Sequence, residues 1–187
     1  MSVKGTTYLE VTEHLKTTVP AIKWVDKDRG QLEDPANFIF PRPAVFVSFG
    51  FGNYENLGKG VLKGEKRLRI RTVYENYADS HTGSINQEKA LAYFEFDEAV
   101  HVALEGFSGT HFTGLTKVAD EDDLDHANLI VGLFEYQMQL VDDSAASSRN
   151  FELLEPDAEL VTNVVRNSQG IEENGDDDSP FVIPGIS

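Results

Sequence analysis

The sequence predicts an α+β fold, in which a small sheet of mostly antiparallel or mixed strands packs against two helices. Leu9, Glu13 and Lys16 are spaced helically within residues 6–18, and apolar residues recur at helical spacing in residues 84–106. In residues 44–51 large apolar side chains instead occupy every second position from Val45 to Phe51. A run that is apolar on both faces, residues 129–131, predicts a strand in a sheet covered on both sides. The 187 residues suffice for one domain, placed at 1–142, followed by a linker and an extended acidic C-terminal arm at 143–187.

The first helix and the first two strands follow from short local signals. Thr6 or Thr7 can cap a helix that ends before Pro20. Residues 21–28 are predicted as a short strand. The second strand, residues 44–51, places four apolar side chains on one face, namely Val45, Val47, Phe49 and Phe51.

A glycine-rich stretch, residues 50–64, is predicted as a long loop between the second and third strands. It contains Gly58-Lys59-Gly60, which superficially matches part of a phosphate-binding loop. That motif needs four residues between its glycines and a Ser or Thr after the lysine, whereas here five residues separate Gly52 from Gly58 and Gly60 follows the lysine. We therefore expect no nucleotide site in this stretch.

The third strand is predicted at residues 66–77 and the second helix at residues 84–106. Ser84 is the expected N-cap of this helix, and Gln87 would complete a capping box. The expected core stripe consists of Ile85, Ala92, Phe96, Ala99, Val100, Ala103 and Phe107.

After the second helix, residues 111–119 are predicted as a connection and residues 120–125 as an acidic turn. The final strand is predicted at residues 128–141. Its inward-facing residues are expected to be Phe134, Tyr136, Met138 and Leu140.

The formal net charge of −16 disfavours proteins that grip nucleic acid phosphates or anionic lipids through a basic face. Half of this charge lies in residues 150–187, which hold nine acidic residues and one basic residue. The arm ends in an apolar stretch that includes Phe181 and Ile183. Because so acidic a segment does not collapse alone, we expect it to dock on a surface outside its own core.

Several groups of side chains could carry chemistry. The sequence has no cysteine, which excludes disulfides and thiolate sites. The acidic cluster 120–126 could offer oxygen ligands to Ca²⁺ or Mg²⁺, but it lacks the central glycine and distal glutamate of a calcium loop. Asp97, His101 and Glu105 are four residues apart and could clamp a metal or relay a proton, although an exposed polar face is the expected arrangement. We predict no enzyme, metal or cofactor, and no membrane span, because no apolar run approaches about 20 residues.

Two surface features are candidate subunit contacts. Leu91, Phe94 and Val102 lie on the side of the second helix away from its expected core stripe. Arg67, Arg69 and Arg71 form a basic stripe on one face of the third strand. This stripe predicts either a solvent-facing strand or a contact with acidic partners in the same chain or a neighbouring one. It is also a candidate acceptor for the arm, whose own contact residues would be Phe181 and Ile183.

Five short segments of the sequence, in the order of the predicted elements, carry a resemblance to a known family. They are Pro20-Ala21-Ile22-Lys23-Trp24-Val25-Asp26-Lys27-Asp28-Arg29-Gly30-Gln31-Leu32, Pro43-Ala44-Val45-Phe46-Val47, Ile85-Asn86-Gln87-Glu88-Lys89-Ala90-Leu91-Ala92-Tyr93-Phe94, Leu104-Glu105-Gly106-Phe107-Ser108-Gly109 and Leu129-Ile130-Val131-Gly132-Leu133-Phe134-Glu135-Tyr136. With the order of the elements over residues 6–142, these segments resemble phage tail-terminator or neck proteins, which complete the tail.

The resemblance implies a structural virion protein that is made in the host bacterial cytoplasm. Proteins of this family form a homo-oligomeric ring, a hexamer, that caps the finished tail tube and joins it to the head or neck connector. The tail-tube protein and the connector are the implied partners, and DNA only passes through the lumen. An acidic lumen would not hold a sliding phosphate backbone, so the net charge is compatible with this role.

Two alternatives remain open at the level of the sequence. One is another phage tail or head-completion structural protein with a related fold. The other is a small metal-dependent enzyme that uses the acidic cluster 120–126 or the pair Asp97 and His101. The oligomeric mass separates them, because a closed ring favours the virion proteins and a monomer stabilised by a divalent cation favours the enzyme.

Overall fold

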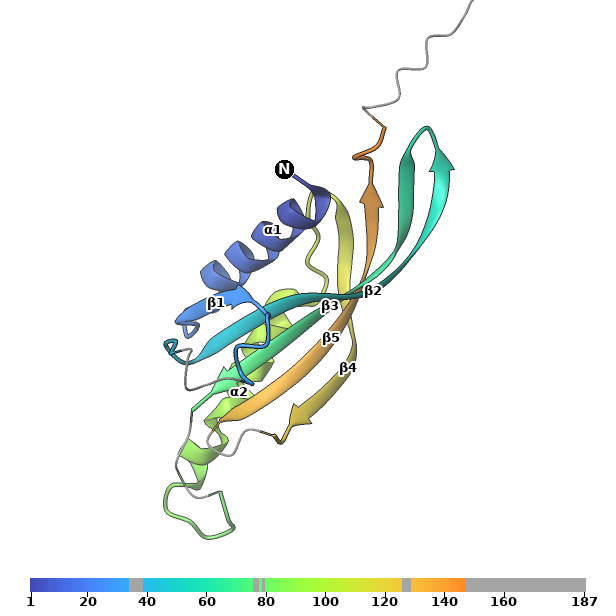
Figure 1. Ribbon diagram of the computed structural model, residues 1–187. Coiled ribbons are helices and arrows are strands. Elements are labelled where there is room, and N and C mark those ends of the chain that lie inside the picture. Colours follow the sequence, from blue (N-terminus) through green and yellow to red (C-terminus); the bar gives the residue numbers. More distant parts are fainter. Residues whose placement is uncertain (34–38, 76–77, 79, 126–128, 147–187) are drawn as a thin grey trace, which may run out of the picture. The chain divides into compact units, whose positions relative to one another are not determined.

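The computed structural model describes residues 1–33, 39–75, 78, 80–125 and 129–146. These belong to one compact unit, residues 1–149. The described residues confirm the α+β class (Figure 1). The elements are α1 (Val3–Thr18), β1 (Trp24–Lys27), β2 (Ala44–Gly58), β3 (Val61–Tyr74), α2 (Gln87–Leu104), β4 (Phe112–Asp123) and β5 (Ile130–Asp142). The expected boundary at residue 142 and the arm itself stay predictions.

The five strands form one mixed sheet in the order β1-β2-β3-β5-β4. β1 runs parallel to β2, and every other neighbouring pair is antiparallel. Both helices cover the same face of this sheet, where apolar residues of α1, α2 and four strands share one core (Figure 1). The inward residues expected for β5 are confirmed, because Phe134, Tyr136, Met138 and Leu140 are all buried in that core.

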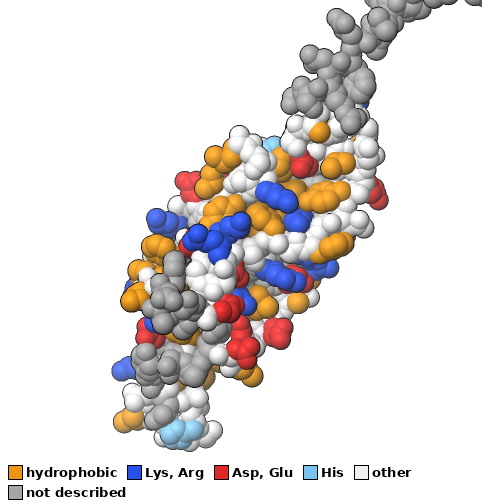
Figure 2. All heavy atoms as spheres, viewed as in Figure 1, with side chains coloured by type: hydrophobic (Ala, Val, Ile, Leu, Met, Phe, Trp, Pro, Cys, Tyr) orange, Lys and Arg blue, Asp and Glu red, His pale blue; other side chains and the backbone are white. Residues whose placement is uncertain are grey.

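The other face of the sheet carries a smaller core at one end. The segment after β1 lies over this end, where Leu32 and Phe40 pack with Phe46 of β2 and Val131 of β5. Elsewhere neither α1 nor α2, the two helices of the described residues, covers this face, and Lys and Arg side chains gather across the strands (Figure 2). We call it the open face.

The glycine-rich stretch is a hairpin, so the predicted loop at residues 50–64 is wrong. β2 and β3 stay paired until Gly58 faces Val61, and Lys59 and Gly60 form the turn with φ of 51° and 81°. Positive φ at both central residues suits the tight turn that matches the twist of two antiparallel strands. At Gly64 a Cβ atom would lie 1.9 Å from the backbone oxygen of Asn53, so glycine serves a close backbone approach here rather than a loop.

The connection and acidic turn predicted for residues 111–125 are also wrong, because residues 112–123 form the edge strand β4. β4 pairs with β5 from Phe112 opposite Leu140 to Asp123 opposite Val131, with two register shifts. Acidic residues are depleted in strands, which is why the pattern suggested a turn. They are tolerated here because the side chains of this edge are largely exposed to water.

The helix starts differ from those expected. α1 begins at Val3, where the Ser2 hydroxyl accepts a hydrogen bond from the Gly5 N–H at 3.2 Å, and Thr7 is fully buried. α2 begins at Gln87 without a side-chain cap, because the Ser84 hydroxyl accepts from the Asn86 N–H instead. In the described residues neither helix has the length and apolar character needed to cross a membrane.

The stripe expected for α2 is only partly correct. Phe96, Val100 and Ala103 are buried in the core, whereas Ile85 and Ala99 are exposed. Ile85 precedes the helix, so the helical periodicity does not apply to it.

Candidate functional site

The outer side of α2 exposes three large apolar side chains. Leu91, Phe94 and Val102 are 36%, 54% and 69% exposed, while Phe96 and Val100 on the inner side are buried. At 100° per residue the three lie on one stripe. The structure therefore places them on the helix back as the sequence predicts, and their role in a subunit contact stays a proposal.

Beside this stripe lies a cleft of about 400 Å³ between α2 and the acidic half of β4. Phe94 and Glu98 of α2 line it, and Phe134 of β5 contributes a ring. The remaining lining residues are Asp97, His101, Lys117, Asp120, Glu121 and Asp122. The cleft thus combines two aromatic rings with five carboxylates and one lysine.

One ammonium group already lies in the cleft. Lys117 Nζ is 2.9 Å from Asp120 Oδ2 and 5.5 Å from the centre of the Phe134 ring. The hydrogen bond and charge of Lys117 lower the pKa of Asp120. The cleft wall can therefore hold a cation between a ring and a carboxylate.

Asp97 is the most perturbed carboxyl group of the cleft. Burial, followed by the negative charge of Asp122, raises its pKa to about 6, although a hydrogen bond with Thr72 and the charge of Lys117 act in the opposite direction. An added cation near Asp97 and Asp122 would stabilise both ionised carboxylates.

The exposed polar face expected for Asp97, His101 and Glu105 is only partly correct, because the first two side chains turn toward the sheet. His101 Nδ1 lies 3.2 Å from the Tyr136 hydroxyl and 3.9 Å from Glu105 Oε2. Glu105 Oε2 accepts a hydrogen bond from the Lys117 N–H at 3.0 Å. These contacts bind α2 to β4 and β5.

The acidic residues of β4 do not converge on one point. Asp120, Glu121 and Asp122 line the cleft, whereas Asp123 lies 3.7 Å from Arg71 on the open face. Among the residues that the structure describes, no three histidine or carboxylate side chains are grouped so that they could hold a metal ion. His126 lies outside the described residues.

The arginine stripe of β3 lies on the open face and finds its acidic partners within the same chain. Arg69 Nε is 3.0 Å from Glu135 Oε1, and Arg67 Nη1 is 4.0 Å from the other oxygen of that carboxylate. The sequence left open whether these arginines face solvent or contact acidic residues, and the structure shows ion pairs with Glu135 of the same chain. A contact of these arginines with a neighbour stays a proposal.

Arg71 has the most extensive set of contacts. Its Nη1 lies 2.8 Å from Glu33 and 3.6 Å from Asp28, and its Nη2 lies 3.7 Å from Asp123. Burial alone would lower the pKa of Arg71, but the hydrogen bond with Glu33 and the three negative charges raise it. This side chain joins β3 to β4 and to the turn after β1.

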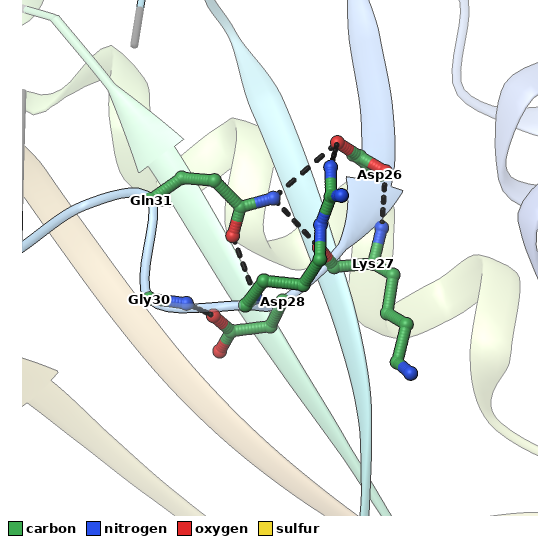
Figure 3. Close-up of polar contacts among 6 residues, drawn as sticks. Asp26, Lys27, Asp28, Gly30 and Gln31 are labelled. Atoms are coloured by element: carbon green, nitrogen blue, oxygen red, sulfur yellow. Dashed lines mark hydrogen bonds and ion pairs between the residues drawn. The ribbon is translucent and has the colours of Figure 1, made fainter. Parts of the chain in front are cut away.

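Arg29-Gly30-Gln31 predicts the turn after β1, and this turn fixes the position of Asp28 (Figure 3). Sequence reasoning did not predict this role of Asp28. The buried Gln31 amide donates to the Lys27 carbonyl at 2.8 Å and accepts from the Arg29 N–H at 2.6 Å. Asp28 Oδ1 accepts from the Gly30 N–H at 3.1 Å. The signal available in the sequence was Asp28-Arg29-Gly30, which is typical of a turn closed by an aspartate side chain.

Phe181 and Ile183, the arm residues expected at an interface, lie outside the described residues.

Comparison with known proteins gives a fold likeness. No family model matches the sequence, and no curated protein matches it. One solved chain that is similar to this one comes from a structure described as "Virion of native gene transfer agent (GTA) particle". It shares 16% sequence identity at a TM-score of 0.45, over 74% of this chain and 97% of that chain. A likeness of this degree does not assign a function.

Proposed function

We propose that this chain is a structural subunit of a phage-like virion that assembles with further copies of itself. The observation that carries the proposal is the apolar stripe Leu91, Phe94 and Val102 on the outer side of α2, next to an open cleft. Large apolar side chains grouped at a cleft are typical of protein–protein contacts. The resemblance of the sequence to tail-terminator and neck proteins supports the same conclusion.

The finer role that the resemblance implies is a tail terminator. In this role copies of the chain form a hexameric ring, which caps the tail tube, meets the head or neck connector and lets DNA pass through its lumen. The acidic character of the chain supports a lumen that repels phosphates. The mechanism is complementarity of shape and charge between subunits and needs no bond chemistry.

The alternative of a metal-dependent enzyme has no specific observation in its favour. The acidic residues of β4 point to both faces of the sheet, and His101 is engaged with Tyr136 and Glu105. We therefore propose the structural role and not the enzymatic one.

The test is the mass and shape of the purified full chain. Light scattering across a range of concentrations should give one closed oligomer, and negative-stain electron microscopy should show rings. Addition of the chain to polymerising tail-tube subunits from the same genome should stop tube growth. A chain that stays monomeric at every concentration and leaves tube length unchanged would overturn the proposal.

A further inference from the structure

Among the described strands, the two lateral edges of the sheet lie at β1 and β4, each of which has a sheet neighbour on one side only. An edge strand presents backbone groups and side chains to any strand or surface that approaches it. The two edges differ in charge, and this difference supports an inference about how copies of the chain meet.

The β1 edge is basic. Lys16, Lys23 and Lys27 are exposed, and none of them forms an ion pair with any described residue. In Figure 3 the Lys27 side chain points away from the hydrogen-bonded turn. Asp26, the acidic residue of this strand, is engaged by Arg29 at 3.1 Å.

The same edge offers an apolar surface. Trp24 is 37% exposed, and with Lys16 and Lys23 it lines a hollow of about 170 Å³. Tryptophan and lysine stems supply apolar area next to the charged groups.

The β4 edge is acidic. Glu121 and Asp122 are exposed, and Glu98 of α2 stands beside them in the cleft. None of these three forms an ion pair within the described part of the chain, whereas Lys117 is taken by Asp120. Phe94 and Val118, which are 54% and 44% exposed, add apolar area at this edge.

We propose that the β1 edge of one copy docks against the β4 edge and the adjoining α2 cleft of the next copy. Lys23 and Lys27 then face Glu121 and Asp122, and Trp24 meets the apolar side chains around Phe94. The occupant is a second copy because one chain carries both complementary surfaces, on opposite edges. The inference rests on the proposed function for the claim that copies assemble, and it adds which surfaces meet.

Such a contact is heterologous, since the two copies contribute different surfaces. A pair of copies therefore keeps one free β1 edge and one free β4 edge, and repetition closes a ring if the rotation between neighbours allows it. Exposed charges across the contact should make assembly weaken with salt, because the Debye length falls to about 3 Å at 1 M.

The test exchanges the charges of the edges in the full chain. One variant carries Lys23→Glu and Lys27→Glu, and the other carries Glu121→Lys and Asp122→Lys. Each alone places like charges at the contact, so we expect its self-association to weaken by about tenfold or more. Mixed in equal amounts, the two variants should co-assemble, because each reversed edge then meets an oppositely charged one, in an alternating ring.

Matched controls change charge equally away from both edges. Lys4→Glu with Lys63→Glu, and Glu55→Lys with Glu65→Lys, should assemble like the natural chain. Circular dichroism and melting temperature report folding for every variant. If a reversed variant does not fold, the neutral pairs Lys23→Gln with Lys27→Gln and Glu121→Gln with Asp122→Asn are measured instead, and each should weaken self-association.

Restored assembly in the mixture supports the inference. Folded edge variants that assemble like the natural chain, or a mixture of folded variants that stays unassembled, would overturn it while leaving the proposed function intact. A natural chain that is monomeric at every concentration would overturn both.

Discussion

Arg71 Nη1 lies 2.8 Å from Glu33 Oε1, and the same guanidinium lies within 3.7 Å of Asp28 and Asp123. Three carboxylates from two segments thus share one side chain that is 20% exposed. Because these segments are far apart in the sequence, this contact fixes the turn after β1 and the end of β4 on the open face.

We expect Arg71→Ala to lower the free energy of unfolding by about 1–3 kcal/mol, since it removes the guanidinium from two partly buried carboxylates, Asp28 and Asp123, and from the more exposed Glu33. Arg69→Ala is the control, because Arg69 is 54% exposed and, among the described residues, its ion pair is with Glu135 alone. Its loss should cost less than about 1 kcal/mol. Urea unfolding followed by circular dichroism measures both, and equal losses would contradict the role of Arg71.

Asp97→Asn should stabilise the fold at neutral pH. Burial raises the pKa of Asp97 to about 6 from its ordinary 3.8, so the folded state holds this proton more tightly than the unfolded state. The stability contributed by this group is therefore lost as pH rises from about 4 through 6. After allowance for partial exposure, we expect a gain of about 1–2 kcal/mol at pH 7.5 and none at pH 4.

Asp120→Asn is the matched control on the same cleft. The pKa of Asp120 is lowered by Lys117, so its ionised form is favoured in the folded state and the substitution should bring no gain at pH 7.5. The melting temperatures of the two variants and the natural chain, measured at pH 4 and pH 7.5, test whether the gain depends on the ionisation of Asp97. A gain for Asp97→Asn that is independent of pH would show that packing, rather than ionisation, is responsible.

The sequence predicts the helices and the central strands because their apolar residues repeat with a clear period. Val45 and Val47 of β2, and Phe134 and Tyr136 of β5, are buried as the alternation indicates. β4 was missed because its second half is a run of acids, and pairing with β5 overrides their low strand propensity.

The candidate site could be predicted only in part for a related reason. The exposed positions of Leu91 and Phe94 follow from helix geometry alone. The partners of Arg71 depend on a turn whose geometry rests on Gln31, and no local pattern relates that turn to β3. The periodicity of apolar residues predicts single helices and strands, and it does not predict which side chains of distant segments come into contact.

Gly64→Ala should destabilise the hairpin. A Cβ atom at this position would lie 1.9 Å from the Asn53 backbone oxygen and 2.7 Å from Tyr54 Cα, and neither backbone atom can move without disturbing the strand pair. We expect a loss of about 1–3 kcal/mol. Gly114→Ala is the control, because nothing lies within 4 Å of its Cβ position. Unfolding midpoints in urea compare the two, and similar midpoints would contradict the close approach.

Leu91→Asp or Phe94→Asp should damage assembly more than folding. Both side chains lie outside the core, so a charge there costs the isolated subunit little while it disrupts an apolar contact. Ala99→Asp adds the same charge on an exposed flank of α2 away from the cleft and should assemble normally. Sedimentation velocity gives the oligomer and circular dichroism the fold. The prediction would be contradicted if the substitutions unfold the subunit and the remaining folded protein still assembles. Both residues would then belong to the core.

Removal of residues 150–187 should leave a folded body. The main core draws its buried residues from Val3 to Leu140, so the deletion removes none of them. Because the deleted segment holds nine acidic residues and ends in an apolar stretch, we expect it to dock on a neighbouring subunit in the assembled particle. The truncated chain should therefore melt like the full chain but form less stable rings.

Limited proteolysis of the free and assembled full chain tests the docking itself. Arg67 and Arg69 are the candidate acceptors, but they share Glu135, so an acidic arm must compete with that carboxylate. Glu135→Gln should for this reason strengthen protection of the arm, and Arg67→Glu with Arg69→Glu should remove it. Phe181→Ser with Ile183→Ser separates the apolar contribution from the charge. An arm cleaved equally fast in free and assembled protein would show that it is a passive tail.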